Sequence, residues 1–344
     1  MQRKTARPSR FFKELETGTQ MLRLGKLDND DLECLVLKKF RRVRPESLSS
    51  PTIGQDCALL DLGGDLAVLS CDPITSASVA HLGRLTVHVS CNDAAAAGAE
   101  PVGLLVTLLM PPSGSMEQIA QIADDLSQAA QLANVDILGG HTEVTDAVTR
   151  AVTSATVVAR QPKNAALRGM RPGDAIVLTK SAAIEGTTIL AEDFAPRLSA
   201  LPDSILAAAR AMTSQLSIVP ESRIAMQHGA SAMHDVTEGG VLGAAWELGY
   251  ANSCAVTIDT SAIPVREETK QICAALALDP LRLIGSGSLL IACEDGERLV
   301  SALLSCGIPA AVIGQAIEGD QSFADGILLE EPHADELYRL PASE

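Results

Sequence analysis

The sequence predicts a mixed α/β (α+β) fold of two domains, and three observations support this. The chain has 344 residues, which is enough for two domains that each bury a core of their own. Apolar runs typical of strands alternate with stretches of helical periodicity in both halves of the chain. A segment rich in Gly and Pro, Arg168 to Asp174, separates the two halves.

The first half predicts an α/β domain. Short apolar runs predict strands, and longer stretches with apolar residues at helical spacing predict helices. The segment Val148 to Val158 alternates Val, Ala and Thr, as a half-buried strand does. The predicted strands are Cys57 to Leu62, Leu66 to Cys71, Val102 to Leu109, Val135 to Leu138 and Val148 to Val158, and the predicted helices are His81 to Ala97 and Ser115 to Leu132.

The second half repeats this mixture from the strand Ala175 to Thr179 onwards. Further strands are expected near 255–259, 288–293, 308–317 and 326–329, and helices near 185–193, 203–213, 221–228, 240–250, 267–277 and 296–305. Residues 1–20 are basic and lack hydrophobic periodicity, which predicts a disordered tail. We therefore expect an N-terminal domain over 21–165 and a C-terminal domain over 166–344.

The composition excludes some partners. Hydrophobic residues make up 47% of the chain and charged residues 20%, which is typical of a folded globular protein. The net charge of -16 argues against binding to a phosphate backbone, and one Trp, two Tyr and five Phe are too few for a base-stacking platform. We therefore expect no nucleic-acid partner. An acidic protein that handles a polyphosphate needs cations between the two sets of negative charge, so metal ions are expected partners.

Cysteine usage and hydropathy predict a cytoplasmic protein. None of the eight cysteines forms a C-x-x-C pair, so we expect buried thiols in a reducing compartment. Neighbouring strand residues point to opposite faces, so Cys57 and Cys71 are expected to face the core while Asp56 and Asp72 face a cleft. The sequence has no secretory signal and no apolar run of 18 residues, which predicts no membrane partner.

Two short motifs place carboxylates beside strands. Asp56 follows Gly54, which permits a tight turn, and Asp72 stands at the end of an apolar strand. Open α/β sheets gather ligands at the carboxyl ends of their strands, and Asp is a common ligand of Mg²⁺. Each motif is weak evidence when it stands alone.

Two further motifs also combine polar and small residues. Asn92-Asp93 lies in an Ala-rich predicted helix, where a solvated helix face is the alternative interpretation. Gly139-Gly140 comes directly after a predicted strand and predicts a glycine turn whose N–H groups cradle phosphate. A turn that only reverses the chain is the alternative there.

Together with His234-Asp235-Val236-Thr237-Glu238-Gly239-Gly240 and Gly285-Ser286-Gly287-Ser288, these motifs resemble a known superfamily in their order. It contains aminoimidazole ribonucleotide (AIR) synthetase, thiamine-monophosphate kinase, selenophosphate synthetase and the hydrogenase-maturation dehydratase HypE. The resemblance runs from about Gly25 to Gly326. It implies a two-domain AIR synthetase-like fold, a homodimer in which the N-terminal domains form a shared β-barrel, and a cleft that binds ATP with Mg²⁺.

The resemblance also implies a set of site residues. The metal ligands would be Asp56, Asp72, Asp93 and Asp235. The nucleotide or its phosphates would contact Asn92, Asp93, Gly139, Gly140, Thr237, Gly239 and Gly240. A catalytic role is implied for Asp235 and considered for His141 and Glu143.

The chain also departs from its relatives at several positions. His141 follows the glycine pair where several members have Asp, so His141 either orients phosphate, transfers a proton, or only hydrogen-bonds across the cleft, and Glu143 is a candidate to restore the lost metal contact. HypE usually has Arg at the position of Glu238. HypE also uses a C-terminal cysteine, whereas the last cysteine here is Cys306, so nitrile formation of the HypE kind is not expected.

These observations predict an ATP- and Mg²⁺-dependent enzyme. It would transfer a phosphoryl group to an oxygen of a small molecule or of a modified side chain on a partner protein, or activate that oxygen. The alternative is a non-catalytic ATP-binding dimer that acts as a maturation scaffold or regulator.

Overall fold

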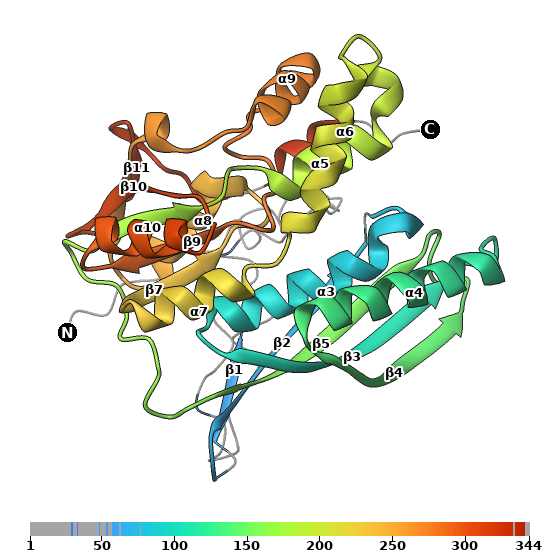
Figure 1. Ribbon diagram of the computed structural model, residues 1–344, viewed down its shortest axis with the longest axis horizontal. Coiled ribbons are helices and arrows are strands. Elements are labelled where there is room, and N and C mark those ends of the chain that lie inside the picture. Colours follow the sequence, from blue (N-terminus) through green and yellow to red (C-terminus); the bar gives the residue numbers. More distant parts are fainter. Residues whose placement is uncertain are drawn as a thin grey trace, which may run out of the picture.

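The computed structural model describes residues 29, 33, 48, 53, 57–61, 63–75, 77–332 and 334–340. The expected tail over 1–20, the candidate metal ligand Asp56 and the cysteine Cys34 lie outside these residues. The described residues form two α/β units, each built on its own sheet, as Figure 1 shows. The segment 162–174 connects the two sheets. The predicted boundary between 165 and 166 stays a prediction.

The N-terminal sheet has five strands in the described residues, in the order β1-β2-β5-β3-β4. All neighbours are antiparallel except β3 and β4, which run parallel. Two helices cover one face of the sheet (Figure 1). The bounds are β1 (Ala58–Asp61), β2 (Leu66–Ile74), α3 (Val79–Ala96), β3 (Glu100–Met110), α4 (Met116–Ala133), β4 (Asp136–Val144) and β5 (Val152–Gln161).

Helix α3 is the centre of this unit, and α4 packs along it. A Cβ on Gly83 of α3 would lie 2.5 Å from the backbone nitrogen of Leu126, so glycine allows the two helices to approach closely. Helix α4 begins with a capping box, in which the side chain of Ser115 accepts a hydrogen bond from the backbone N–H of Gln118. Leu82, Val87 and Cys91 pack into the core shared with the sheet, so α3, which carries the Asn92-Asp93 motif, is held against the sheet.

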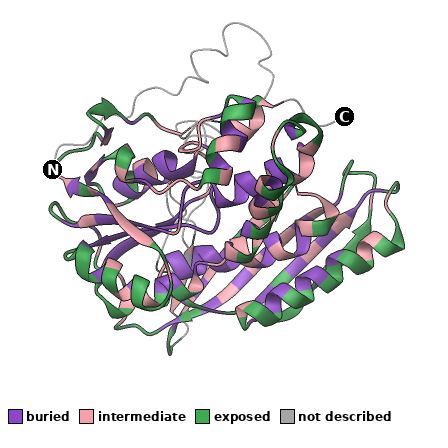
Figure 2. Cartoon of the chain, turned by 45° about the horizontal axis from the view of Figure 1, so that its top comes forward, coloured by how far each residue is buried: buried purple, intermediate pink, exposed green. Residues whose placement is uncertain are grey.

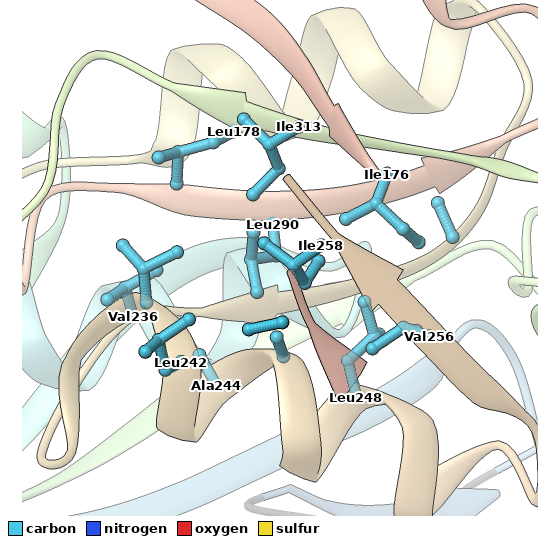
Figure 3. Close-up of a cluster of buried hydrophobic side chains, with 14 of the residues drawn as sticks. Ile176, Leu178, Val236, Leu242, Ala244, Leu248, Val256, Ile258, Leu290 and Ile313 are labelled. Carbon is cyan, nitrogen blue, oxygen red and sulfur yellow. The ribbon is translucent and has the colours of Figure 1, made fainter. Parts of the chain in front are cut away.

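The C-terminal sheet has seven strands in the described residues, in the order β12-β11-β8-β10-β6-β9-β7. Its strands are β6 (Ala175–Thr179), β7 (Ala230–Asp235), β8 (Ala255–Ile258), β9 (Leu289–Cys293), β10 (Ala310–Ile317), β11 (Phe323–Ala324) and β12 (Ile327–Leu328). Its helices are α5 (Ile184–Asp193), α6 (Asp203–Ala211), α7 (Val219–Gln227), α8 (Gly240–Ala251), α9 (Glu267–Leu276) and α10 (Gly296–Ser305). Helix α8 lies against the sheet through Leu242, Ala244 and Leu248, which face Ile176, Leu178, Leu290 and other sheet residues (Figure 3).

The two sheets differ in how their faces are covered. The central strands β6 and β9 are buried along nearly their whole length. In contrast, the face of the N-terminal sheet opposite α3 and α4 is exposed or half-buried, and β4 is exposed at every residue (Figure 2). Large apolar side chains on β3 and β4 remain exposed there, namely Val102, Leu105 and Leu138. This outer face of the N-terminal sheet lacks a covering layer within the described part of the chain.

Most elements lie within a few residues of their predicted bounds, with some exceptions. Strands β7 and β11 were not predicted, although β7 carries His234 and Asp235. Gly139-Gly140 was predicted to form a turn, but both residues lie inside β4 and pair with β3. Among the described helices, none has the length and apolar character that a membrane span requires.

Candidate functional site

A cavity of about 900 Å³ lies between the two units. Cys57, Leu59, Val68, Asp93 and Gln161 line it from the N-terminal unit. The other wall comes from β7, from the second half of α8 and from the residues after α8, namely Ser231 to Asp235, Trp246, Gly249 to Cys254 and Asp320. This volume is at the upper end of the range for small-molecule and cofactor sites.

Two predicted metal ligands, Asp93 and Asp235, both line this cavity although they belong to different units. Asp93 lies in the last turn of α3, and its carboxylate accepts a hydrogen bond from the hydroxyl of Ser70 on β2. Asp235 ends β7, where the chain turns toward α8. Their exposed fractions are 5% and 2%, so both residues are almost fully buried.

The charge of the cavity is negative. Asp93, Asp235 and Asp320 line it, and none of the described lining residues is Lys or Arg. A polyphosphate that entered would be repelled unless cations came with it. Among the described residues there is no group of three His, Cys, Asp or Glu side chains arranged to hold a metal. Mg²⁺ commonly takes one or two carboxylates together with substrate phosphates, so Asp93 and Asp235 fit such an ion.

Asp72 lies two residues after Ser70 on β2, so the two side chains point to the same face of the sheet. It is half-buried, and it is not one of the residues that line the cavity. Its neighbour Cys71 is exposed on the opposite face of the sheet. The prediction that Cys71 faces the core is therefore wrong, because the buried face of β2 carries Leu66, Val68 and Ser70.

The buried thiol beside the site is unreactive. Cys91 is fully buried on α3, and burial, together with the charge of Asp93, raises the pKa of its thiol to about 12. A thiol with such a pKa is not ionised at neutral pH and is a poor nucleophile.

Asn92 joins the two units through its side-chain amide. The amide Nδ2 donates to the carbonyl oxygen of Leu216 at 2.8 Å, and Oδ1 accepts from the backbone N–H of Ile218 at 3.0 Å. Nearby, the hydroxyl of Ser222 donates to the carbonyl oxygen of Ala95 at 2.5 Å. The predicted contact of Asn92 with nucleotide stays untested, but its amide already holds α3 against the segment 216–218.

Gly139 and Gly140 serve the packing of β4. A Cβ on Gly140 would lie 1.8 Å from the carbonyl oxygen of Val106, and its φ of +146° is a conformation that side chains rarely adopt. Gly139 has a φ of +152°, but a Cβ there would meet only the end of the Leu105 side chain at 3.8 Å. The predicted phosphate contact of this pair remains a prediction, and it cannot arise from a turn.

His141 and Glu143 lie on the exposed edge strand β4, with Nε2 of His141 and Oε2 of Glu143 3.4 Å apart. The strand register places His141 opposite Thr107, Thr107 opposite Ser154, and Ser154 opposite Pro73. His141 is therefore three strands, roughly 14 Å, from the Asp72 region of the same chain. Neither His141 nor Glu143 lines the interdomain cavity.

The turn over Thr237, Glu238, Gly239 and Gly240 has two of its backbone amides engaged by the chain itself. The N–H of Gly239 donates to Oδ2 of Asp335 at 2.8 Å, and the N–H of Gly240 donates to the carbonyl oxygen of Thr237 at 3.1 Å. A Cβ on Gly240 would lie 2.5 Å from the carbonyl oxygen of Leu281, so this position requires glycine. The predicted nucleotide contacts of Thr237, Gly239 and Gly240 are untested.

A buried acidic cluster surrounds this turn, and the sequence analysis missed it. Glu185, Glu238 and Asp335 lie near one another, and the hydroxyl of Tyr338 donates to Oε1 of Glu238 at 2.9 Å. Burial is the main cause that raises the pKa of Glu185 to about 7 and the pKa of Asp335 to about 6. Asp335 and Tyr338 follow the segment that resembles the superfamily, so no motif pointed to them.

Comparison with known proteins identifies the family. The AIR synthase related protein N-terminal domain matches residues 54–160, and the corresponding C-terminal domain matches residues 171–326. Carbamoyl dehydratase HypE of Azotobacter vinelandii is 32% identical over 255 residues, which cover 70% of this chain and 71% of that protein. The chain belongs to the AIR synthase related family. The resemblance inferred from the ordered motifs is thereby confirmed.

Solved structures of this family confirm the predicted two-domain fold. AaThiL complexed with AMPPCP and TMP superposes with a TM-score of 0.74 at 18% identity, covering 92% of this chain and 99% of that one. Hydrogenase maturation protein HypE in complex with ATP has a TM-score of 0.67 at 24% identity, covering 91% of this chain and 97% of that one.

Proposed function

We propose that this protein binds ATP with Mg²⁺ in the interdomain cavity and uses a phosphoryl group to activate an oxygen of its substrate. The observation that carries this proposal is that Asp93 and Asp235, from two different units, line one cavity of about 900 Å³. Family structures that contain ATP or AMPPCP support the choice of ligand.

The chain's own residues would bind and orient the phosphates in this proposal. Mg²⁺ supplies charge neutralisation between the phosphates and the carboxylates of Asp93 and Asp235. The Ser70 hydroxyl orients the Asp93 carboxylate by donating a hydrogen bond to it. Because both carboxylates are almost fully buried, their electrostatic effect on a bound phosphate is stronger than at an open surface. Asp72 and Asp56 remain candidate ligands.

The substrate is an oxygen nucleophile, either on a small molecule or on a modified side chain of a partner protein. Hydrogenase maturation and carbamoyl dehydration are the activities named for HypE relatives, and the second kind of substrate agrees with them. The rival is an ATP-binding dimer without turnover, which serves as a scaffold or regulator. The engagement of the Gly239 N–H by Asp335 favours this rival, because it removes one donor that a phosphate would use.

Turnover of labelled ATP in the presence of Mg²⁺ separates these two functions. ADP formation by the wild-type protein, reduced at least about 100-fold in Asp93→Asn and Asp235→Asn, supports the enzyme. Glu318→Gln, a substitution of a carboxylate outside the cavity lining, is the matched control and should keep the wild-type rate. Tight binding of ATP with no turnover would favour the scaffold, and no binding at all would refute both.

A homodimer through the outer face of the N-terminal sheet is part of the same proposal. This face exposes apolar side chains on β3 and β4, and β4 is an edge strand whose outer backbone groups can pair with another strand. His141 and Glu143 lie on β4, so they can serve in catalysis only if this contact brings them to a site. Sedimentation should give twice the chain mass of 35.9 kDa at micromolar concentration, and a monomer mass would contradict the dimer.

A further inference from the structure

Lys180 carries a buried amine directly after β6. Its side chain is 10% exposed, and its Nζ lies 2.6 Å from Oε1 of Glu221, whose side chain is 3% exposed. Nζ also donates to the carbonyl oxygens of Gln215 at 2.8 Å and of Ser217 at 2.7 Å. Burial lowers the pKa of this amine, and the charge of Glu221 opposes that shift. Each of the three N–H donors of the ammonium thus has an acceptor, and all three acceptors lie within the stretch 215–221.

The backbone of Lys180 is held in an uncommon conformation. Its φ is +56°, in the left-handed region that residues other than glycine rarely adopt. Its N–H donates to the carbonyl oxygen of Pro309 at 2.6 Å. Such strain persists only where surrounding contacts hold the residue in place, and it occurs most often at functional sites. The conformation of Lys180 therefore points to a role beyond closing the loop between β6 and α5.

The stretch that Lys180 binds also holds α3 of the N-terminal unit. The side-chain amide of Asn92 is hydrogen-bonded to backbone groups at positions 216 and 218. The amine of Lys180 is hydrogen-bonded to the carbonyl groups at positions 215 and 217. The segment 215–218 is thus bound on one side to Lys180 of the C-terminal unit, and on the other to Asn92, which directly precedes Asp93 on α3.

Lys180 also stands at the same end of the C-terminal sheet as Asp235. Strands β6 and β7 both pair antiparallel with β9, so they run in the same direction and end at the same edge. Leu289 on β9 lies opposite Asp235, and its N–H donates to Oγ1 of Thr179 at 3.0 Å. Two strand spacings, roughly 10 Å, therefore separate Thr179 from Asp235. Because Lys180 directly follows Thr179, paired strands fix its position relative to Asp235.

We propose that Lys180 is a positioning residue that sets the placement of Asp93 relative to Asp235 across the interdomain cavity. It holds the side of Asp93 through the segment 215–218 and the Asn92 amide, and the paired strands tie it to Asp235. This inference rests on the proposed binding of Mg·ATP by these two carboxylates. Mg²⁺ demands a near-ideal arrangement of oxygen ligands, so a small shift of one unit against the other lowers its affinity.

A double variant, Lys180→Met/Glu221→Gln, removes the amine without leaving a buried carboxylate unpaired. Removing one partner of a buried ion pair is strongly destabilising, so both charges are removed together. Methionine donates no hydrogen bond, so the carbonyl groups at 215 and 217 lose their donor. If this protein fails to fold, Lys180→Gln/Glu221→Gln, in which the new side chain is uncharged and one bond shorter than lysine, takes its place.

Two controls separate the placement of the units from general stability. Glu221→Gln keeps the amine and offers it an amide oxygen as acceptor. Leu276→Ala removes a buried side chain of α9 from a core cluster that contains no residue of 215–221, and Leu276 does not line the cavity. We expect Leu276→Ala to lower the free energy of unfolding, measured by urea denaturation, without moving the two units.

Titration calorimetry measures the affinity of each protein for ATP over a series of Mg²⁺ concentrations. We expect Lys180→Met/Glu221→Gln to need about tenfold more Mg²⁺ than wild type to reach half of its maximal affinity, and to approach wild-type affinity at saturating Mg²⁺. Lys180→Gln/Glu221→Gln should need at least about threefold more. Glu221→Gln and Leu276→Ala should stay within about twofold of wild type.

Three results would contradict these expectations. Wild-type dependence on Mg²⁺ in the double variant overturns the inference and leaves the proposed function standing. An equal shift in Leu276→Ala or in Glu221→Gln also overturns it, because lost stability or the lost carboxylate would then explain the result. If wild type binds no ATP at any Mg²⁺ concentration, the proposed function fails as well.

Discussion

Gly139-Gly140 and Gly239-Gly240 are two glycine pairs that stand in different surroundings. The first pair lies inside the edge strand β4, where every residue is exposed. The second pair joins β7 to α8, where Gly239 is capped by Asp335 and Gly240 is buried. In each pair, one glycine is required because a neighbouring backbone carbonyl leaves no room for a Cβ. The Gly-Gly dipeptide thus permits close packing of two strands in the N-terminal unit and a tight turn in the C-terminal unit.

Replacing Gly140 should have the largest effect on stability. In Gly140→Ala the new Cβ would lie 1.8 Å from the carbonyl oxygen of Val106, and the φ of +146° is strained for alanine. We expect the free energy of unfolding to fall by about 4 kcal/mol or more, measured by urea denaturation with circular dichroism. Loss of soluble protein would agree with this result. A variant as stable as wild type would show that β3 and β4 can move apart without lowering the free energy of unfolding.

Replacing Gly240 should have the next largest effect. In Gly240→Ala the Cβ would lie 2.5 Å from the carbonyl oxygen of Leu281, at a φ of +62°. Since turn residues can shift more easily than paired strands, we expect a loss of about 2–3 kcal/mol in the same urea measurement. If this loss exceeds that of Gly140→Ala, the turn is the more rigid of the two places.

The acidic cluster around the second pair predicts a pH dependence of stability. The folded-state pKa values of Glu185 and Asp335 are raised to about 7 and about 6, so the folded protein holds protons that the unfolded chain releases near pH 4. The stability that these two groups contribute is complete below about pH 4, and it is lost as pH rises through 6 and 7.

Glu185→Gln imitates the protonated side chain and tests this dependence. At pH 8 the variant should have a higher free energy of unfolding than wild type, and at pH 5 the difference should shrink. Urea denaturation of both proteins from pH 5 to pH 8 measures the two curves. Parallel curves would show that Glu185 does not change its protonation on unfolding in this range.

Gly139→Ala should have the smallest effect and completes the comparison of the pairs. A Cβ there has space, since the nearest atom is a Leu105 side-chain carbon at 3.8 Å, and only the φ of +152° opposes alanine. We expect a loss of about 1 kcal/mol in urea denaturation. A loss as large as that of Gly140→Ala would mean that the backbone conformation, and not the contact with Val106, governs both positions.

The sequence predicts the long elements well and the short ones poorly. Helices α3 and α4 have long apolar patterns, and both lie within a few residues of the predicted bounds. Strand β7, with the sequence Ala-Ser-Ala-Met-His-Asp, has little of the β-branched or aromatic character that indicates a strand, and it is held by pairing with β9. Gly139-Gly140 was misjudged because glycine pairs usually indicate turns, whereas here glycine permits an extended strand with positive φ.

The candidate site could be predicted only in part, because its members come together through tertiary contacts. The order of the motifs identified the family, and the structure brings Asp93 and Asp235 to one cavity. The separation of His141 from Asp72 follows from strand order, which the sequence does not reveal. Trp246 and Tyr250 stand in a predominantly apolar helix, and only the structure shows that they line the cavity.

The hydrogen bonds of the Asn92 amide affect whether the N-terminal unit is stable on its own. Its two polar ends are satisfied by backbone groups of Leu216 and Ile218, in the other unit. If residues 57–161 were produced alone, this fully buried amide would lose both partners, and the apolar end of α3 would lose its cover. We therefore expect a separated N-terminal unit to be unstable. Any recombination between relatives in this family would have to exchange α3 and the segment 216–218 together.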